Sequence, residues 1–282
     1  MAVHRSQTVR RRRLGIQLRQ LRDDAGLTIE EVAGRLRCSE SKVSRIENGQ
    51  IGASPDDVRE MLLLYGTTEQ RLEDLIQVAR EERKKKWWHA YRDVFDSPYV
   101  TYEAAAKLIE SYGGLLVPGL LQTKEYATAV LRALAPQISP DEAARRIEFR
   151  MLRQTILAAD DPPLLTVVLD EAVLRRQVGG RDMMRNQLRR LLNASANSSV
   201  TLQIVEFGAG QHSGLGGSFT LLHFENEDDR DLVYFETAIR SVVYSDDPHV
   251  VQDSMEAFER LRGVALSPDE STALLVTLTN EL

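Results

Sequence analysis

Apolar residues recur at helical spacing in the first part of the chain. Leu14, Leu18 and Leu21 lie three or four positions apart and are followed by Gly26, which predicts a helix over residues 11–25. Four further helices are predicted by residues that favour helix starts: Thr28 followed by Glu31, Ser39, Ser54 followed by Pro55, and the region of Thr68. We therefore expect an all-α N-terminal domain of about five helices.

The pattern changes near Trp87 and Trp88, where we expect a domain junction. Beyond it, helical spacing predicts helices over 101–112, 123–134, 141–159, 181–194, 248–262 and 268–279. Short apolar or alternating runs predict strands over 164–169, 200–205, 218–224, 232–236 and 240–244. The chain is thus predicted to comprise a helical domain over 1–86 and an α+β domain over 87–282 with a mostly antiparallel sheet.

Composition narrows the class of protein. Of the 282 residues, 43% are apolar, which is ample for two folded cores. The single cysteine, Cys38, excludes a disulfide framework within the chain and argues against a cysteine-based zinc site. We see neither the apolar core of a signal peptide nor a run long enough to span a membrane, so we expect a cytoplasmic protein.

Charge is divided unevenly between the two predicted domains. Residues 1–86 hold 18 basic and 14 acidic residues, a balance of +4, whereas residues 87–282 hold 18 basic and 28 acidic residues, a balance of −10. A basic N-terminal domain joined to an acidic C-terminal domain favours nucleic-acid binding by the N-terminal domain. The cluster Arg10 to Arg13 fits either a phosphate-contacting arm or a solvated tail.

The most informative stretch is GLTIEEVAGRLRCSESKVSRIENG, residues 26–49. Two short helices are joined by a tight turn at Arg37 and Cys38, and small Ala33 lets the helices approach each other. This is the spacing of a helix-turn-helix, whose second helix must project into the major groove of DNA. The plainer alternative is a second helix that only packs within a small helical domain.

Residues 28–33 and 44–49 together resemble the XRE (Cro/C1-type) helix-turn-helix regulators, over about residues 10–78. The resemblance implies that the second helix of the motif reads DNA and that the protein binds as a homodimer. It also implies a structural ion pair between Arg22 and Glu47.

The same resemblance assigns the base-facing positions to Glu40, Ser41 and Arg45. The chemistry of these side chains fits base recognition. Arginine can donate two hydrogen bonds to guanine, glutamate can accept one from cytosine, and serine can bond to either base.

Phosphates are expected to meet Lys42, Asn48 and the helix-start backbone groups near Thr28 and Ser39. Ile29 departs from the family, which often has glutamine there, and it cannot form the hydrogen bond of that glutamine.

The second half resembles the C-terminal domain of WhiJ-like, antitoxin-like transcriptional regulators of actinobacteria. The segments that carry the resemblance are VPGLLQT from residue 117, RMLRQ from residue 150, LDEAVLRR from residue 169 and GSFTLL from residue 217. The resemblance covers about residues 90–277. It implies a module that binds a small partner protein, often one encoded nearby, or receives a signal.

No constellation in the second half predicts catalysis. The glycine-rich stretch 207–217 lacks the lysine and the strand-to-helix context of a phosphate loop, so we interpret it as a flexible hairpin loop rather than an anion cradle. Adjacent Asp170 and Glu171 fit a helix start better than an acid–base pair. The five histidines show no metal-ligand spacing. We expect no enzyme activity, no cofactor and no metal.

These observations favour a homodimeric regulator that binds double-stranded DNA, with a C-terminal domain that binds a small partner protein or a ligand. The alternative is an antitoxin-like protein that mainly sequesters a small partner and binds DNA for autoregulation.

Overall fold

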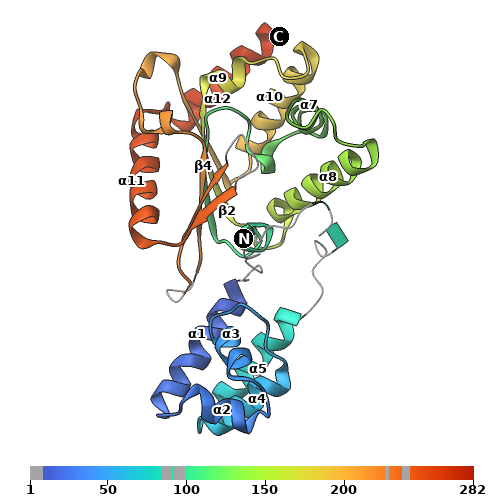
Figure 1. Cartoon of the computed structure of the whole chain (residues 1–282). Helices are drawn as coiled ribbons and strands as arrows, with labels where there is room; N and C mark the ends of the chain where they lie inside the picture. The colour runs from blue at the N-terminus through green and yellow to red at the C-terminus, as the bar shows by residue number, and fades with distance from the viewer. Residues whose placement is uncertain (1–8, 84–89, 92–93, 95–98, 226–228, 237–241) are drawn as a thin grey trace. The chain divides into compact units, whose positions relative to one another are not determined.

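The computed structural model describes residues 9–83, 90–91, 94, 99–225, 229–236 and 242–282 (Figure 1). The predicted junction at Trp87 and Trp88 lies outside these residues. The described chain forms two compact units: the first contains helices α1 to α6, and the second contains Val94 and the chain from Ala106 to Leu282. Each unit is treated by itself below.

The described elements of the first unit are all helices, which confirms the prediction of five helices for the helix-turn-helix region. The helices are α1 (Val9–Asp24), α2 (Ile29–Arg35), α3 (Glu40–Glu47), α4 (Pro55–Leu64) and α5 (Glu69–Arg83). A short helix, α6 (Tyr99–Glu103), precedes the second unit. Because α1 begins at Val9, Arg10 to Arg13 belong to a helix and not to a tail.

Helix starts in this unit follow from local side-chain chemistry. Thr28 and Glu31 form a complete capping box at the start of α2. Ser54 caps α4, with Pro55 in its first turn. All five helices contribute to one apolar core, whose fully buried members include Leu18, Val32, Val43, Met61 and Ala79.

The second unit is built on one sheet with the strand order β3-β2-β1-β4-β5-β6 in the described residues. Its strands are β1 (Leu108–Gly113), β2 (Leu164–Asp170), β3 (Val200–Val205), β4 (Phe219–His223), β5 (Leu232–Glu236) and β6 (Val242–Ser245). β1, β2 and β3 pair in parallel, whereas β1 with β4, β4 with β5 and β5 with β6 pair antiparallel. The sheet is therefore mixed, and the prediction of a mostly antiparallel sheet was wrong.

The error arose at β1. Residues 101–112 were predicted to be helical, but the chain forms α6 and then the strand Leu108–Gly113 near the middle of the sheet. Two polar residues, Glu110 and Ser111, interrupt the apolar pattern by which a buried strand is recognised in a sequence. Both are nevertheless buried. Each forms a polar contact with a residue of β4: Glu110 with His223, and Ser111 with Thr220. These partners lie more than a hundred positions away, so no pattern of neighbouring residues predicts them.

Helices cover both faces of the sheet (Figure 1). On one side lies α11 (Pro248–Val264), whose Val251, Phe258 and Leu261 pack on Tyr112 and Phe219 of the sheet. On the other side lie α7 (Lys124–Leu134), α8 (Pro140–Arg153) and α10 (Arg181–Ser195). The remaining elements are η2 (Gly119–Leu121), η3 (Gln154–Ala158), α9 (Glu171–Arg175), η4 (Phe207–Ala209), η5 (Ser213–Gly216) and α12 (Pro268–Glu281).

The glycine-rich stretch 207–217 joins β3 to β4, which β2 and β1 separate in the sheet. It is therefore not a hairpin loop, and that interpretation was wrong. The stretch folds into two 3-10 turns, η4 and η5, and is anchored at both sides. Ser213 Oγ donates to the Ala257 carbonyl at 2.6 Å, and Ser218 Oγ accepts from the Gly114 N–H at 3.0 Å.

Candidate DNA interface

Helix α3 presents one face to solvent and the opposite face to the core of the first unit. Glu40, Ser41 and Arg45 are all exposed. Ser41 and Arg45 lie one helical turn apart on the same face, and Glu40 precedes Ser41, so the three span about 140° of the helix circumference. Val43 and Ile46, on the other side, are at most 2% exposed. The three side chains expected to face bases are thus brought together on one surface whose backbone is fixed from behind.

The turn between α2 and α3 is closed by backbone hydrogen bonds. The Cys38 N–H donates to the Ala33 carbonyl at 3.0 Å, and Arg37 adopts a left-handed conformation with φ 50°. A residue with a Cβ rarely adopts this conformation, so Arg37 introduces local strain. Ala33 is 3% exposed, and its small side chain permits the close approach of the two helices.

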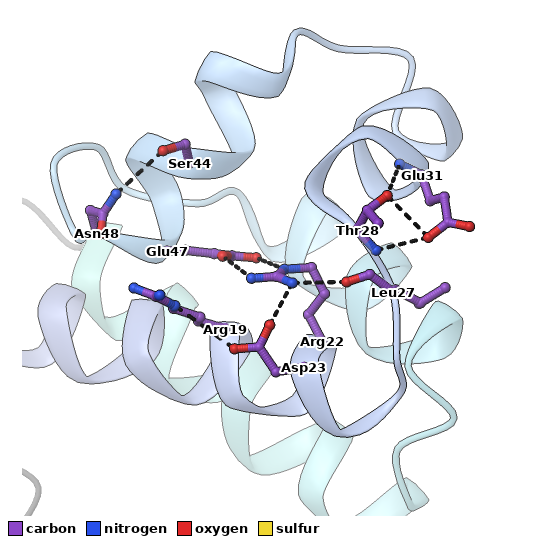
Figure 2. A network of polar contacts seen from close by, with 9 residues as sticks. All are labelled: Arg19, Arg22, Asp23, Leu27, Thr28, Glu31, Ser44, Glu47 and Asn48. Carbon is purple, nitrogen blue, oxygen red and sulfur yellow. Dashed lines mark hydrogen bonds and ion pairs between the residues drawn. The ribbon is translucent and has the colours of Figure 1, made fainter.

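A buried ion pair ties α1 to the end of α3. Arg22 Nε donates to Glu47 Oε1 at 2.7 Å and Arg22 Nη2 to Glu47 Oε2 at 3.0 Å (Figure 2). The third donor group, Nη1, bonds the Leu27 carbonyl at 2.8 Å. The Glu47 carboxylate outweighs the effect of burial and raises the pKa of Arg22 further above its ordinary value. One guanidinium therefore connects α1, the start of α2 and the end of α3.

Tyr65 lies near this pair and its hydroxyl is buried without a hydrogen-bond partner among the described residues. Burial, with a smaller contribution from the negative charge of Glu47, raises the pKa of Tyr65 well above its ordinary value. The ion pair is thus buried in the unit. Loss of Arg22 would leave the Glu47 charge without its partner, whereas loss of Glu47 would leave Arg22 paired only with the exposed Asp23, whose Oδ1 lies 2.6 Å from Nη1.

The start of α2 is occupied by its own capping residues. The Thr28 N–H donates to Glu31 Oε2 at 2.8 Å, and the Glu31 N–H donates to Thr28 Oγ1 at 3.2 Å (Figure 2). Hydrogen bonds from Thr28 lower the pKa of Glu31. Because the Thr28 amide is engaged, the helix-start groups that remain to meet a phosphate at α2 are those of Ile29 and Glu30.

The start of α3 is arranged in the same way. Ser39 Oγ accepts from the Lys42 N–H at 3.2 Å, which leaves the N–H groups of Glu40 and Ser41 in the first turn. At the other end of the helix, exposed Asn48 donates to Ser44 Oγ at 3.3 Å.

Lys42 is held by a partner that the sequence did not reveal. Its Nζ lies 2.9 Å from Asp57 Oδ2 and 3.0 Å from Oδ1, so the pair ties α3 to the first turn of α4. Burial raises the pKa of Asp57, but hydrogen bonds from Lys42 and Ser54 outweigh it and lower the pKa overall. The Lys42 ammonium is thus partly neutralised at the position where a phosphate contact was expected.

One further residue that shapes the interface was missed. Gly15 in α1 lies against the backbone of α3, whereas Arg37 lies in the turn that the sequence predicted at Arg37 and Cys38. An isolated glycine within a helical pattern is a usable signal of close packing, and it could have identified Gly15. No local signal marks Asp57 as the partner of Lys42.

Three polar residues of the second unit that were considered above, Asp170, Glu171 and His212, accept hydrogen bonds from backbone N–H groups. Asp170 caps α9 and accepts from the Ala172 N–H at 2.8 Å, while Glu171 accepts from the Phe207 N–H at 2.8 Å. His212 Nδ1 accepts from the Gly214 N–H at 3.2 Å. Across the described part of the chain, no group of three or more histidine, cysteine, aspartate or glutamate side chains could hold a metal ion. None of the described helices is long and apolar enough to cross a membrane.

Comparison with known proteins finds a family match for each of the two parts of the chain. Residues 13–75 match a family described as a helix-turn-helix domain, which supports a DNA-binding regulator of the XRE-like kind. Residues 97–277 match a family described as a domain of unknown function, DUF5753. No curated protein and no solved structure matches the chain. Because the second match spans more than half of the sequence, the chain belongs to the DUF5753 family, here with a helix-turn-helix domain at its N-terminal side.

Proposed function

We propose that this chain is a cytoplasmic transcriptional regulator that binds double-stranded DNA sequence-specifically and acts by binding, not by catalysis. The observation that carries the proposal is the geometry of α3. Glu40, Ser41 and Arg45 share its exposed face, while its buried face is fixed to the core and to α1. A preorganised helix with polar side chains on its outer face is suited to the major groove.

In this proposal, Arg45 donates two hydrogen bonds to a guanine, Glu40 accepts from a cytosine amino group, and Ser41 contacts an adjacent base. Backbone N–H groups at the starts of α2 and α3 meet phosphates, together with Asn48 and Lys42. Lys42 contributes less than a free lysine would, because Asp57 competes with the phosphate for its ammonium group.

We further propose a homodimer. One α3 reaches only a few base pairs, which is too little sequence to define a regulatory site among the competing sites of a genome. A two-fold pair would place two α3 helices in successive major grooves, about 34 Å apart, on a palindromic target.

The second unit is proposed to bind a small partner protein or a ligand and thereby to change the affinity for DNA. The supporting observation is the division of charge: the balance of +4 in residues 1–86 stands against −10 in residues 87–282. An acidic body is repelled by DNA, so a partner that neutralises or covers it would strengthen DNA binding.

The test begins with selection of DNA ligands for the full chain from a random duplex pool. Fluorescence anisotropy then compares the selected duplex with a scrambled one over a salt series. We expect selective binding that weakens steeply as salt rises. Arg45→Ala should weaken selective binding by about 1–3 kcal/mol and relax the preference at one base pair. Arg59→Ala, which removes an exposed arginine from α4, is the matched control.

Equal binding to both duplexes, or equal effects of the two variants, would contradict α3 as the reader. Partner binding is tested by purifying the full chain from its native cell extract and identifying what accompanies it. A small stoichiometric protein that lowers DNA affinity in titration would favour the antitoxin-like alternative, in which sequestration is the main activity.

A further inference from the structure

A hollow of about 440 Å³ lies between α1 and α5 in the first unit. This volume falls within the range of small-molecule sites, about 300–1,000 Å³. Its lining combines charged, amide and apolar side chains: Arg13 and Gln17 from α1, Thr68 just before α5, and Gln70, Arg71, Asp74, Leu75 and Val78 from α5.

The two arginines of the hollow have no side-chain partner among the described residues. Neither Arg13 nor Arg71 forms an ion pair or a side-chain hydrogen bond with any residue in the described part of the chain. Arg22 and Lys42 of the same unit are engaged, by Glu47 and Asp57, and so are not available to an anion in the same way. Two guanidinium groups at one hollow therefore keep their donor groups available for an anion.

The other lining groups limit what such an anion can be. Asp74 accepts a hydrogen bond from the Gln70 amide at 3.3 Å. Because this donor is neutral, the negative charge of Asp74 is not cancelled and counts toward the charge of the hollow. Two arginines and one aspartate give a net charge of +1, which suits a monoanion better than a dianion. Leu75 is buried and Val78 is half-buried, so both offer apolar surface to a hydrocarbon body.

We propose that this hollow is a binding site for a small organic monoanion, a carboxylate attached to an apolar body. The carboxylate accepts hydrogen bonds from Arg13 and Arg71, and the apolar body lies on Leu75 and Val78. The fork of donors on a guanidinium matches the two oxygens of a carboxylate.

The site is separate from the proposed DNA-reading surface. Gly15 faces α3, and Arg13 and Gln17, two residues to either side of it, point to the opposite side of α1. A ligand in the hollow would therefore leave the exposed face of α3 free and would instead link α1 to α5. The proposal does not rest on DNA binding, and each can fail without the other.

The test uses the full chain with labelled leucine and valine methyl groups, titrated with 2-naphthoate while its NMR spectrum is recorded. The amide 2-naphthamide, which has the same shape without the charge, is the ligand control. We expect 2-naphthoate to shift the methyl signals of Leu75 and Val78 and to bind at least about tenfold more tightly than the amide.

Arg71→Gln and Arg13→Gln should each weaken 2-naphthoate binding by about tenfold. Arg80→Gln, which alters an exposed arginine of α5 outside the hollow, should leave it unchanged. Equal binding of the acid and the amide would overturn the proposal. So would equal affinities of the Arg71→Gln and Arg80→Gln variants.

Discussion

Gly15 of α1 lies directly against the backbone of Ile46 in α3. A Cβ atom added to Gly15 would lie 2.6 Å from the Ile46 carbonyl oxygen and 2.6 Å from that of Glu47, closer than non-bonded atoms approach. Because Glu47 also bonds Arg22 of α1, the end of α3 is fixed by a steric contact and by an ion pair at once. The orientation of the exposed face of α3 depends on both.

Replacement of Gly15 by alanine should therefore destabilise the protein. The steric cost of forcing atoms into a packed contact, about 1–3 kcal/mol, exceeds the gain in helix propensity of about 1 kcal/mol. Urea denaturation of the helical unit in the full chain measures the free energy of unfolding. Gly34→Ala is the matched control: Gly34 is exposed in α2, an added Cβ meets no atom within 4 Å, and the variant should gain about 0.5–1 kcal/mol. A stabilised Gly15→Ala variant would contradict the close contact.

The Arg22–Glu47 pair should show strong coupling in a double-mutant cycle. Arg22 is 7% exposed and Glu47 is 4% exposed, so either single replacement leaves a buried charge without its buried partner, and Arg22 then keeps only the exposed Asp23. Arg22→Met and Glu47→Leu should each lower the free energy of unfolding by about 3–5 kcal/mol. The double variant should lose much less than the sum, because no buried charge remains unpaired and Asp23, which also loses Arg22, is exposed to solvent. Additive losses would mean that the two side chains act independently.

Features that depend on neighbours within a few residues could be predicted from the sequence. The capping box of Thr28 and Glu31 is an example, because both partners lie within one helical turn. The bounds of β3 and β5 were also predicted, since each is a short run with β-favouring residues.

Features that depend on residues far along the chain could not be predicted from the sequence. β1 was mistaken for helix because Glu110 is satisfied by His223, which lies far along the chain. The position of the exposed face of α3 follows from helical spacing, but Asp57 lies 15 positions from Lys42, beyond any local pattern. The sequence therefore predicted which residues face outward, and not which of them are already engaged.

Asp57 should restrain DNA binding through Lys42. In Asp57→Asn, the Lys42 ammonium loses its ion pair and becomes free to meet a phosphate. We expect tighter non-specific DNA binding, with a salt dependence steeper by about one counterion. Asp56→Asn makes the same change of charge at an exposed neighbour that does not contact Lys42, and it should have a smaller effect. Anisotropy over a salt series compares the two variants, and equal slopes would argue against a restrained Lys42.

Arg37 should be replaceable by glycine with a gain in stability. Its φ of 50° is costly for a residue with a Cβ, by about 1 kcal/mol, and glycine adopts it freely. Arg37→Gly should therefore raise the free energy of unfolding by up to about 1 kcal/mol. Arg35→Gly, at the end of α2, removes the same side chain from a helical position and should lower it by a similar amount. Thermal denaturation should therefore show a stabilised Arg37→Gly variant and a destabilised Arg35→Gly variant. A change of stability in the same direction for both would contradict strain at Arg37.

His223 should make the stability of the second unit depend on pH. Its Nε2 lies 3.0 Å from Glu110 Oε2 and its Nδ1 lies 2.6 Å from Asp231 Oδ2, so both ring nitrogens face carboxylates. Burial lowers the pKa of His223, but these two contacts outweigh it and raise the pKa to about 9. The imidazolium therefore contributes stability that is fully present below about pH 6.5, the value of an unfolded histidine, and is lost as the pH rises through about 9. Urea midpoints across this range should fall in the unaltered protein and in His249→Gln, an exposed control on α11, but change little in His223→Gln. Parallel curves for all three proteins would show that the two carboxylates do not hold the proton on His223.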